Sequence, residues 1–403
     1  MDETTGAVRS MYEQYPYPSG PVVNRIGADV ELVLSYGSRR RETSGPYRVL
    51  DAGCGRGLGL LGAATLQPEV RFLGVDVSRV SLEDARRQAD QRGLKNVAFA
   101  EVDLMTLDGL EVPPGGFDVI HSSGVLHHLA DPLAALAGLR GVLAPHGVIN
   151  LMVYGRCGRE SLQELAGAVA LLFPPEVGLE GRLPAAREVA ALARGHALAG
   201  TRFEDTAGVD DVEFVDRMLN VNETSYDVPA LFDLLEATGL TFLRWLEPAD
   251  WDPRRVVPDG ELRRRLLDLD PRRRFTVLER IFRPAGLELI VAHAGNEPRP
   301  PLTAADLSRA RFRLHPETVV TKGVRHTPGD IRIETLSFTV RTRKPVTLGA
   351  GPAAVAVMLM AERPGARTGT ALLSDLKRAG LGSAEAQAVI LELLRHEVIF
   401  RLP

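Results

Sequence analysis

The chain has 403 residues, too many for one ordinary core, and its 45% hydrophobic and 25% charged residues are the proportions of a globular protein. A formal net charge of −4 excludes a global attraction to nucleic acid or anionic membranes, and no apolar run reaches the roughly 20 residues of a membrane span. The first residues lack a secretory signal, and two cysteines are too few for a disulfide framework or an iron–sulfur cluster. We therefore expect a cytoplasmic protein with no metal site.

The N-terminal segment combines a helical stretch with tyrosines and prolines. Residues 5–15 have helical character and lead into Tyr15-Pro16-Tyr17-Pro18, where a proline after each tyrosine keeps the chain extended and stiff. One interpretation is a strap packed on the surface of a domain. The other is a lid over a ligand, because tyrosines offer a flat face and a hydroxyl. A helix is predicted over 26–37, and residues 1–45 form this N-terminal segment.

Residues 47–59 predict a strand, a tight loop and a helix. The apolar run ends at Asp51, and the loop Gly53-Cys54-Gly55-Arg56-Gly57 precedes a helix over 58–66. Glycines suit a loop whose backbone turns sharply and contacts a ligand. The spacing differs from the dinucleotide fingerprint, and a carboxylate two residues before the first glycine would repel phosphate. It suits a ligand with an ammonium group and no phosphate, such as S-adenosylmethionine (SAM).

Four more strands follow, alternating with helices over 79–92 and 132–143. Residues 70–75 end at Asp76, residues 96–100 precede Asp103-Leu104, residues 117–121 end at His121, and residues 147–153 are the fifth strand. This alternation predicts a parallel sheet with helices on both faces, which binds ligands beyond the carboxyl ends of its strands. The acids after the first three strands and His121 should therefore meet in one cleft.

These motifs, taken in order, resemble those of class I SAM-dependent methyltransferases: Asp51-Ala-Gly-Cys-Gly-Arg-Gly, Gly74-Val-Asp-Val-Ser, Asp103-Leu104, Phe117-Asp-Val-Ile and Gly124-Val-Leu-His-His-Leu. The competing interpretation is a doubly wound domain with a chance glycine loop. The resemblance implies a Rossmann-like α/β fold with a seven-stranded sheet, a SAM-binding core over 46–158, and SAM as the cofactor. The predicted cofactor-binding residues are Tyr15, Tyr17, Asp51, Gly53, Cys54, Gly55, Gly57, Asp76, Val77, Asp103, Leu104, Ser122 and Ser123.

Beyond the fifth strand, residues 159–227 are predicted to form a helical insertion, with helices over 159–173 and 184–199. A helix over 228–239 and strands over 240–246 and 287–293 complete the sheet within 228–297. The stretch 216–229 resembles one that follows the core in a bacterial group with a Tyr-Pro-Tyr-Pro leader, although Val221 replaces the usual proline. Asp216, Asn220 and Tyr226 are its predicted substrate residues. Arginines over 250–280 alternate with acids, which favours salt-bridged helix faces over a nucleic-acid surface.

A proline-rich linker at 296–301 separates an accessory domain over 302–403. Strands are predicted over 332–341 and 346–348, an apolar stretch over 352–362, helices over 368–377 and 384–395, and a strand over 398–402. This order predicts a smaller, winged-helix-like α+β domain. By architecture it loosely resembles the accessory domains of rickettsial protein-lysine methyltransferases. A tail over 302–403 is larger than a small acceptor needs, which favours a peptide or protein acceptor; a homodimer surface is the alternative.

Methyl transfer from a sulfonium is an in-line displacement, so the protein must mainly hold the acceptor in line with the methyl carbon. A hydroxyl or a protonated amine also needs a base, and the candidates are His121, His127 and His128, each of which has a packing or capping role as its alternative. The place after the fourth strand lacks the Asn/Asp-Pro-Pro-aromatic motif of amide- and base-directed methyltransferases, which disfavours the exocyclic amines of DNA and glutamine side chains as acceptors. We predict transfer to a nitrogen or oxygen acceptor; the alternatives are a small natural-product acceptor and a non-catalytic SAM-binding regulator.

Overall fold

The computed structural model describes residues 2–23, 29–42, 44–340, 346–349, 352–362 and 365–403. The chain divides into two compact units, one formed by residues 1–30 and 41–298 and the other by residues 31–40 and 299–403. The predicted helix over 26–37 begins outside the described residues, and within the described residues 29–37 the structure has the shorter helix α2 (Val30–Leu34). No described helix combines the length and apolar character needed to cross a membrane.

The first unit is built on a seven-stranded sheet with the order β3-β2-β1-β4-β5-β7-β6. Its strands are β1 (Arg48–Ala52), β2 (Arg71–Asp76), β3 (Val97–Glu101), β4 (Phe117–Ser123), β5 (Leu143–Tyr154), β6 (Leu240–Trp245) and β7 (Gly286–His293). The first five strands are parallel, but β7 runs antiparallel to both β5 and β6. The Rossmann-like, seven-stranded prediction is confirmed, and the sheet is mixed because of β7.

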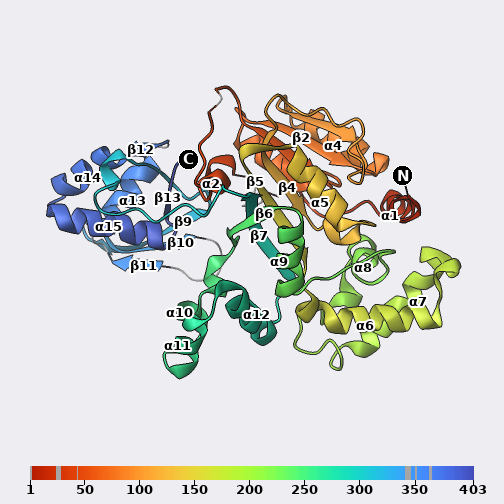
Figure 1. Cartoon of the computed structure of the whole chain (residues 1–403). Coiled ribbons are helices and arrows are strands. Elements are labelled where there is room, and N and C mark those ends of the chain that lie inside the picture. Colours follow the sequence, from red (N-terminus) through yellow and green to blue (C-terminus); the bar gives the residue numbers. More distant parts are fainter. Residues whose placement is uncertain (1, 24–28, 43, 341–345, 350–351, 363–364) are drawn as a thin grey trace. The chain divides into compact units, whose positions relative to one another are not determined.

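Helices follow the strands of this sheet, and α5 and α9 lie in front of it in Figure 1. They are α3 (Leu58–Leu66), α4 (Arg79–Gln91), α5 (Pro132–Gly141), α9 (Val228–Ala237), α10 (Pro253–Val256), α11 (Glu261–Asp268) and α12 (Pro271–Phe282), and α1 (Glu3–Gln14) precedes the first strand. Helix α9 shows how the sequence sets such limits. Asp227 accepts a hydrogen bond from the Ala230 amide, Pro229 lies in the first turn, and the helix stops before Gly239, whose φ is +66°.

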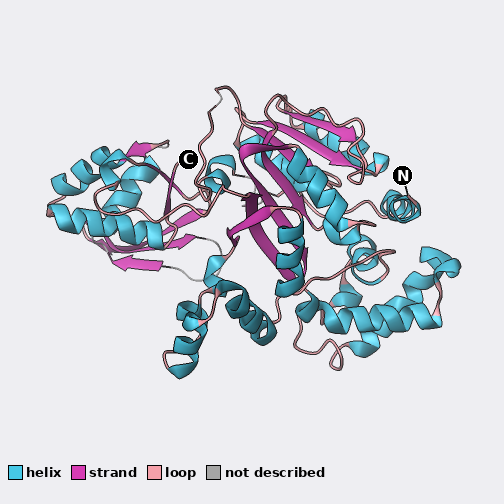
Figure 2. Cartoon of the chain, viewed as in Figure 1, coloured by secondary structure: helices cyan, strands magenta, loops and turns pink. Residues whose placement is uncertain are grey.

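Between β5 and α9 the chain forms only helices and loops (Figure 2). Helices α6 (Arg156–Leu172) and α7 (Gly178–Ala193) run side by side, and α8 (Asp211–Met218) packs on both. The predicted limits of the second helix, 184–199, are wrong: α7 begins six residues earlier and continues through Pro184. The three helices share an apolar cluster with α1, in which Met11 is 2% exposed. The insertion therefore packs against the N-terminal helix.

The second unit is a smaller α+β domain, as predicted. Its elements are β8 (Arg311–Leu314), β9 (Thr318–Thr327), β10 (Asp330–Val340), β11 (Val346–Gly349), α13 (Pro352–Glu362), β12 (Arg367–Thr368), α14 (Gly369–Arg378), α15 (Ser383–Arg395) and β13 (Ile399–Arg401). They form two antiparallel three-stranded sheets, β11-β10-β9 and β12-β8-β13. Residue 341, the last of the predicted strand 332–341, lies outside the described residues. Strands β8 and β9 were not predicted.

Candidate active site

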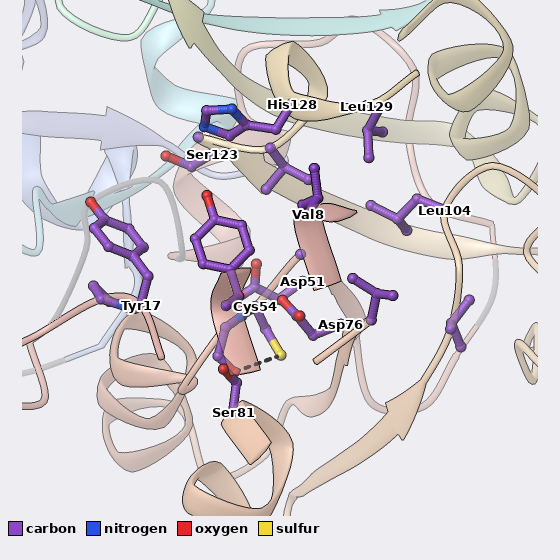
Figure 3. Close-up of a pocket in the computed structure, with 18 of the residues that line it drawn as sticks. Val8, Tyr17, Asp51, Cys54, Asp76, Ser81, Leu104, Ser123, His128 and Leu129 are labelled. Atoms are coloured by element: carbon purple, nitrogen blue, oxygen red, sulfur yellow. Dashed lines mark hydrogen bonds between the residues drawn. The ribbon is translucent and has the colours of Figure 1, made fainter. Parts of the chain in front are cut away.

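A pocket lies at the carboxyl ends of β1, β2 and β4, where the topology brings the strand-end residues together. His128 and Ser123 lie at one end of it, and Asp76 and Ser81 lie at the other (Figure 3). Asp51, from the end of β1, lies between these two groups. The two ends therefore differ in character, with an imidazole at one and a carboxylate at the other.

The glycine loop brings the N-terminal strap against this pocket. Gly55 has φ +51°, and a Cβ atom built there would lie 2.4 Å from the carbonyl oxygen of Tyr17. The amide of Arg56 donates to that same oxygen at 3.1 Å, and the Arg56 guanidinium donates to the oxygen of Pro18 at 3.1 Å. Glycine is thus needed at position 55 because the strap backbone occupies the space of a side chain.

Asp76 holds the loop from the other side. Its Oδ2 accepts from the Gly55 amide at 2.8 Å, and its Oδ1 accepts from the Ser78 amide at 2.9 Å. Burial raises the pKa of Asp76, and these amide hydrogen bonds oppose the shift. A carboxylate has about four lone-pair sites, so Asp76 retains acceptor capacity toward a ligand in the pocket.

The carboxylate of Asp103, which follows β3, has a hydrogen-bond partner for only one of its two oxygens among the described residues. Its Oδ1 accepts from the Met105 amide at 2.9 Å, whereas its Oδ2 is buried and has no hydrogen-bond partner among the described residues. A buried, unpaired carboxylate oxygen is costly, so its presence in a pocket wall indicates a donor that arrives with a ligand.

Helix α1 and the strap form another wall of the pocket. Thr5, Val8 and Tyr12 of α1 line it together with Tyr17 and Pro18. Asp2 caps the helix by accepting from the Thr5 amide at 2.9 Å. Arg9 forms an ion pair with Glu101, at the end of β3, at 2.9 Å. The N-terminal segment therefore packs over the strand ends rather than on a distant surface.

The three candidate histidines occupy different environments. His128 lines the pocket, and its Nδ1 lies 2.8 Å from the carbonyl oxygen of Asn222. His121 also lines it, with its Nδ1 3.1 Å from the Asn150 amide nitrogen. His127 is fully buried and does not line the pocket; its Nδ1 accepts from the Tyr154 amide at 3.2 Å, and the two rings stack at 3.7 Å. Burial lowers the pKa of His127 well below its usual range, so it stays neutral.

A buried carboxylate from the insertion lies beside His128. Asp216, on α8, is 3% exposed and accepts from the Tyr12 hydroxyl at 2.8 Å and from the Tyr154 hydroxyl at 3.0 Å. Its Oδ1 lies 4.0 Å from Nε2 of His128. The amide nitrogen of Asn220 donates to the Tyr12 hydroxyl at 3.2 Å. Four segments of the chain thus meet beside this end of the pocket.

Twelve of the predicted site residues line the pocket: Tyr17, Asp51, Gly53, Cys54, Gly55, Asp76, Val77, Asp103, Leu104, His121, Ser123 and His128. Seven do not: Tyr15, Gly57, Ser122, His127, Asp216, Asn220 and Tyr226. Tyr15 packs on the insertion cluster and Tyr226 belongs to the sheet core. Sequence reasoning missed Thr5, Val8 and Tyr12, although the helical pattern of residues 5–15 already placed all three on one helix.

The sheet and its strand-end pocket define a Rossmann-like α/β fold. Comparison with known proteins identifies the family: the family described as "Methyltransferase domain" matches residues 44–170 of this chain. An uncharacterized protein of Synechococcus sp. is 30% identical over 290 residues, 69% of this chain and 69% of that protein. The aklanonic acid methyltransferase of Streptomyces sp. (strain C5) is 33% identical over 162 residues, 39% of this chain and 67% of that protein.

Among solved structures, PKMT2 from Rickettsia typhi has a similar fold, with a TM-score of 0.67 at 15% identity over 96% of this chain and 77% of that one. The chain belongs to the class I SAM-dependent methyltransferases, and S-adenosylmethionine is its cofactor. The recognition made from the sequence motifs is confirmed.

Proposed function

We propose that the pocket between the strand ends and α1 holds SAM, with the adenine at Asp103, the ribose at Asp76 and the methionine part against the glycine loop. The observation that carries this placement is the buried Oδ2 of Asp103, which has no partner among the described residues. An adenine amino group is a donor that would satisfy it. Asp76 supports the proposal because its carboxylate keeps acceptor capacity for ribose hydroxyls.

When bound, SAM supplies a methyl group on a sulfonium that is already activated for displacement. What this chain contributes is position and exclusion of water. Thr5 and Val8 of α1 cover the pocket, and the strap is tied to the glycine loop through Tyr17 and Arg56. The N-terminal segment had two interpretations, a lid over a ligand and a strap on the domain surface. These contacts favour the lid.

Calorimetry with SAM tests the placement of the adenine. Asp103→Ala should weaken SAM binding about 10- to 150-fold, because a hydrogen bond to a charged group contributes about 1.5–3 kcal/mol. Asp108→Ala is the matched control, since it removes a nearby exposed aspartate outside the pocket. Equal affinity in the wild type and in Asp103→Ala would remove the basis of the placement.

We further propose that the acceptor atom is a nitrogen or an oxygen, on a peptide or protein. The solved structure with a similar fold over 96% of this chain is named PKMT2, and the α6–α8 insertion and the second unit offer surfaces beyond the needs of a small acceptor. The alternative is a small natural-product acceptor, which the name of the aklanonic acid methyltransferase favours. A homodimer surface is the competing role for the second unit.

Methyl-labelled SAM added with the enzyme to an extract of the source cells separates these acceptors. Label that is retained with protein after denaturing precipitation, with a mass increase of one methyl group on a peptide, is the expected result. Label found only in the small-molecule fraction would contradict the peptide acceptor and support the alternative. Absence of label in both fractions, with SAM binding retained, would favour a SAM-binding regulator.

A further inference from the structure

The environment of His128 fixes which of its nitrogens carries the proton. A carbonyl oxygen can only accept a hydrogen bond, and that of Asn222 lies 2.8 Å from Nδ1. Nδ1 of the neutral ring is therefore protonated, and Nε2 carries the lone pair. The side-chain amide of Asn222 donates to the carbonyl oxygens of His128 and Leu129 at 3.1 and 3.0 Å, which ties the two backbone segments together. The basic nitrogen of His128 is Nε2.

Nε2 lies beside a carboxylate that is itself firmly held. Asp216 Oδ1 is 4.0 Å from Nε2, and each oxygen of Asp216 accepts from one tyrosine hydroxyl. Burial, followed by the charge of Asp216, raises the pKa of both Tyr12 and Tyr154 well above the usual range, so both phenols remain donors. Because Asp216 accepts from two phenols, its orientation is fixed; its Oδ1 lies beside the imidazole, and Asp216 does not line the pocket.

The groups around the ring come from four elements. Tyr12 from α1 lies with its ring centroid 6.4 Å from that of His128, and Tyr154 from β5 lies at 5.5 Å. Asp216 comes from α8, and His127, on the same turn, lies at 4.3 Å. Since His127 stays neutral, Asp216 is the charged group that faces His128 among the side chains named here. The amide nitrogen of Asn220 is the other polar neighbour of Nε2, at 3.5 Å, and the nearby Asp216 carboxylate favours a proton taken up at that nitrogen.

We propose that His128 is the general base of the reaction, that Asp216 is its positioning residue, and that the acceptor is a hydroxyl or ammonium group with a proton to lose; this inference rests on the proposed function. Nε2 takes the proton of the acceptor heteroatom, and the lone pair of that atom forms the bond to the methyl carbon. The carbon–sulfur bond breaks, and its electron pair remains on sulfur, giving the neutral thioether. The charge passes from the sulfonium to the imidazolium beside Asp216, and the proton then leaves to solvent.

This assignment changes the roles predicted from the sequence. Asp216, predicted to contact the substrate, acts through His128 instead. A thiolate or a tertiary amine has no proton to lose and would gain nothing from such a base. The pair of His128 and Asp216 thus favours acceptors that must lose a proton over acceptors that have none to lose.

The first test needs no acceptor. Nitrogen NMR of the full chain, labelled with ¹⁵N-histidine and saturated with S-adenosylhomocysteine, reports the tautomer of each imidazole, and His128→Gln identifies the signals of His128. We expect the Nδ1–H form for His128. The Nε2–H form would overturn the inference, because the nitrogen near Asp216 would then be a donor.

The second test uses the acceptor fraction labelled in the extract. Asp216→Asn should lower turnover at least tenfold at neutral pH, keep SAM affinity within about threefold, and lose less activity as pH rises, because the acceptor then loses its proton without help. Asp216→Glu should restore part of the rate, and Tyr12→Phe, which retains the ring, should show the same trend with a smaller loss. Asp90→Asn, on the exposed end of α4, is the control.

The outcomes separate this inference from the proposed function. Failure of the wild-type protein to bind SAM would overturn the proposed function. Normal SAM binding with a pH-independent loss in Asp216→Asn and Tyr12→Phe would mean that both residues act only through packing, and would overturn this inference alone.

Discussion

Replacing His128 by glutamine is expected to lower turnover by about 10²- to 10⁴-fold, the range that a general base contributes, while SAM affinity changes little. Glutamine keeps a polar side chain of similar length but has no nitrogen that can take up a proton. The measurement is the initial rate of label transfer to the acceptor fraction, together with calorimetry. His196→Gln is the matched control, since His196 is exposed on the insertion.

His127→Gln distinguishes the two neighbouring histidines. His127 is fully buried against Tyr154 and accepts from its amide, so its loss should lower the free energy of unfolding. The folded fraction should retain most of its turnover, because His127 does not line the pocket. An equal loss of activity in the folded His127→Gln protein and in His128→Gln would contradict the assignment of His128 alone as the base.

Replacing Asp76 by alanine should weaken SAM binding about 10- to 150-fold, since the ribose loses a charged acceptor and the glycine loop loses its anchor to Gly55 and Ser78. Asp76→Asn, which keeps one acceptor oxygen, should lose less. Calorimetry checks both variants, with Asp90→Ala as the exposed control. Unchanged affinity in Asp76→Ala would contradict the ribose assignment.

The same residue predicts how SAM affinity depends on pH. Burial raises the pKa of Asp76, so its carboxyl protonates at a higher pH than an exposed aspartate. The carboxylate accepts hydrogen bonds, and the protonated form loses acceptor capacity. Affinity should therefore hold above the raised pKa and fall as pH drops through it, and Asp76→Asn should remove that part of the dependence.

The strand-end lining of the pocket was predictable because its signals are local. Asp51, Asp76 and Asp103 each stand at or just after a short apolar strand, and parallel strands place such residues at one edge of a sheet. Gly53 and Gly55 lie in the loop, where positive φ angles are required. In each case a short stretch of sequence determines the local backbone structure by itself.

The contacts around His128 were not predictable, because they join distant segments. Tyr12 and Asp216 are 204 residues apart, and no period or spacing indicates their hydrogen bond. The direction of β7 also escaped prediction, since an apolar strand pattern reads the same in both orientations. Proline is uncommon inside a helix, so the sequence predicts a helix that starts at Pro184. In the structure Pro184 lies inside α7.

A crystal structure of the full chain with S-adenosylhomocysteine tests the central claim most directly. The account predicts that the adenine amino nitrogen lies about 2.7–3.2 Å from Oδ2 of Asp103, that the ribose hydroxyls face Asp76, and that sulfur lies toward the end of the pocket formed by Ser123 and His128. A ligand bound outside this pocket, or one that leaves Oδ2 of Asp103 without a donor, would contradict it.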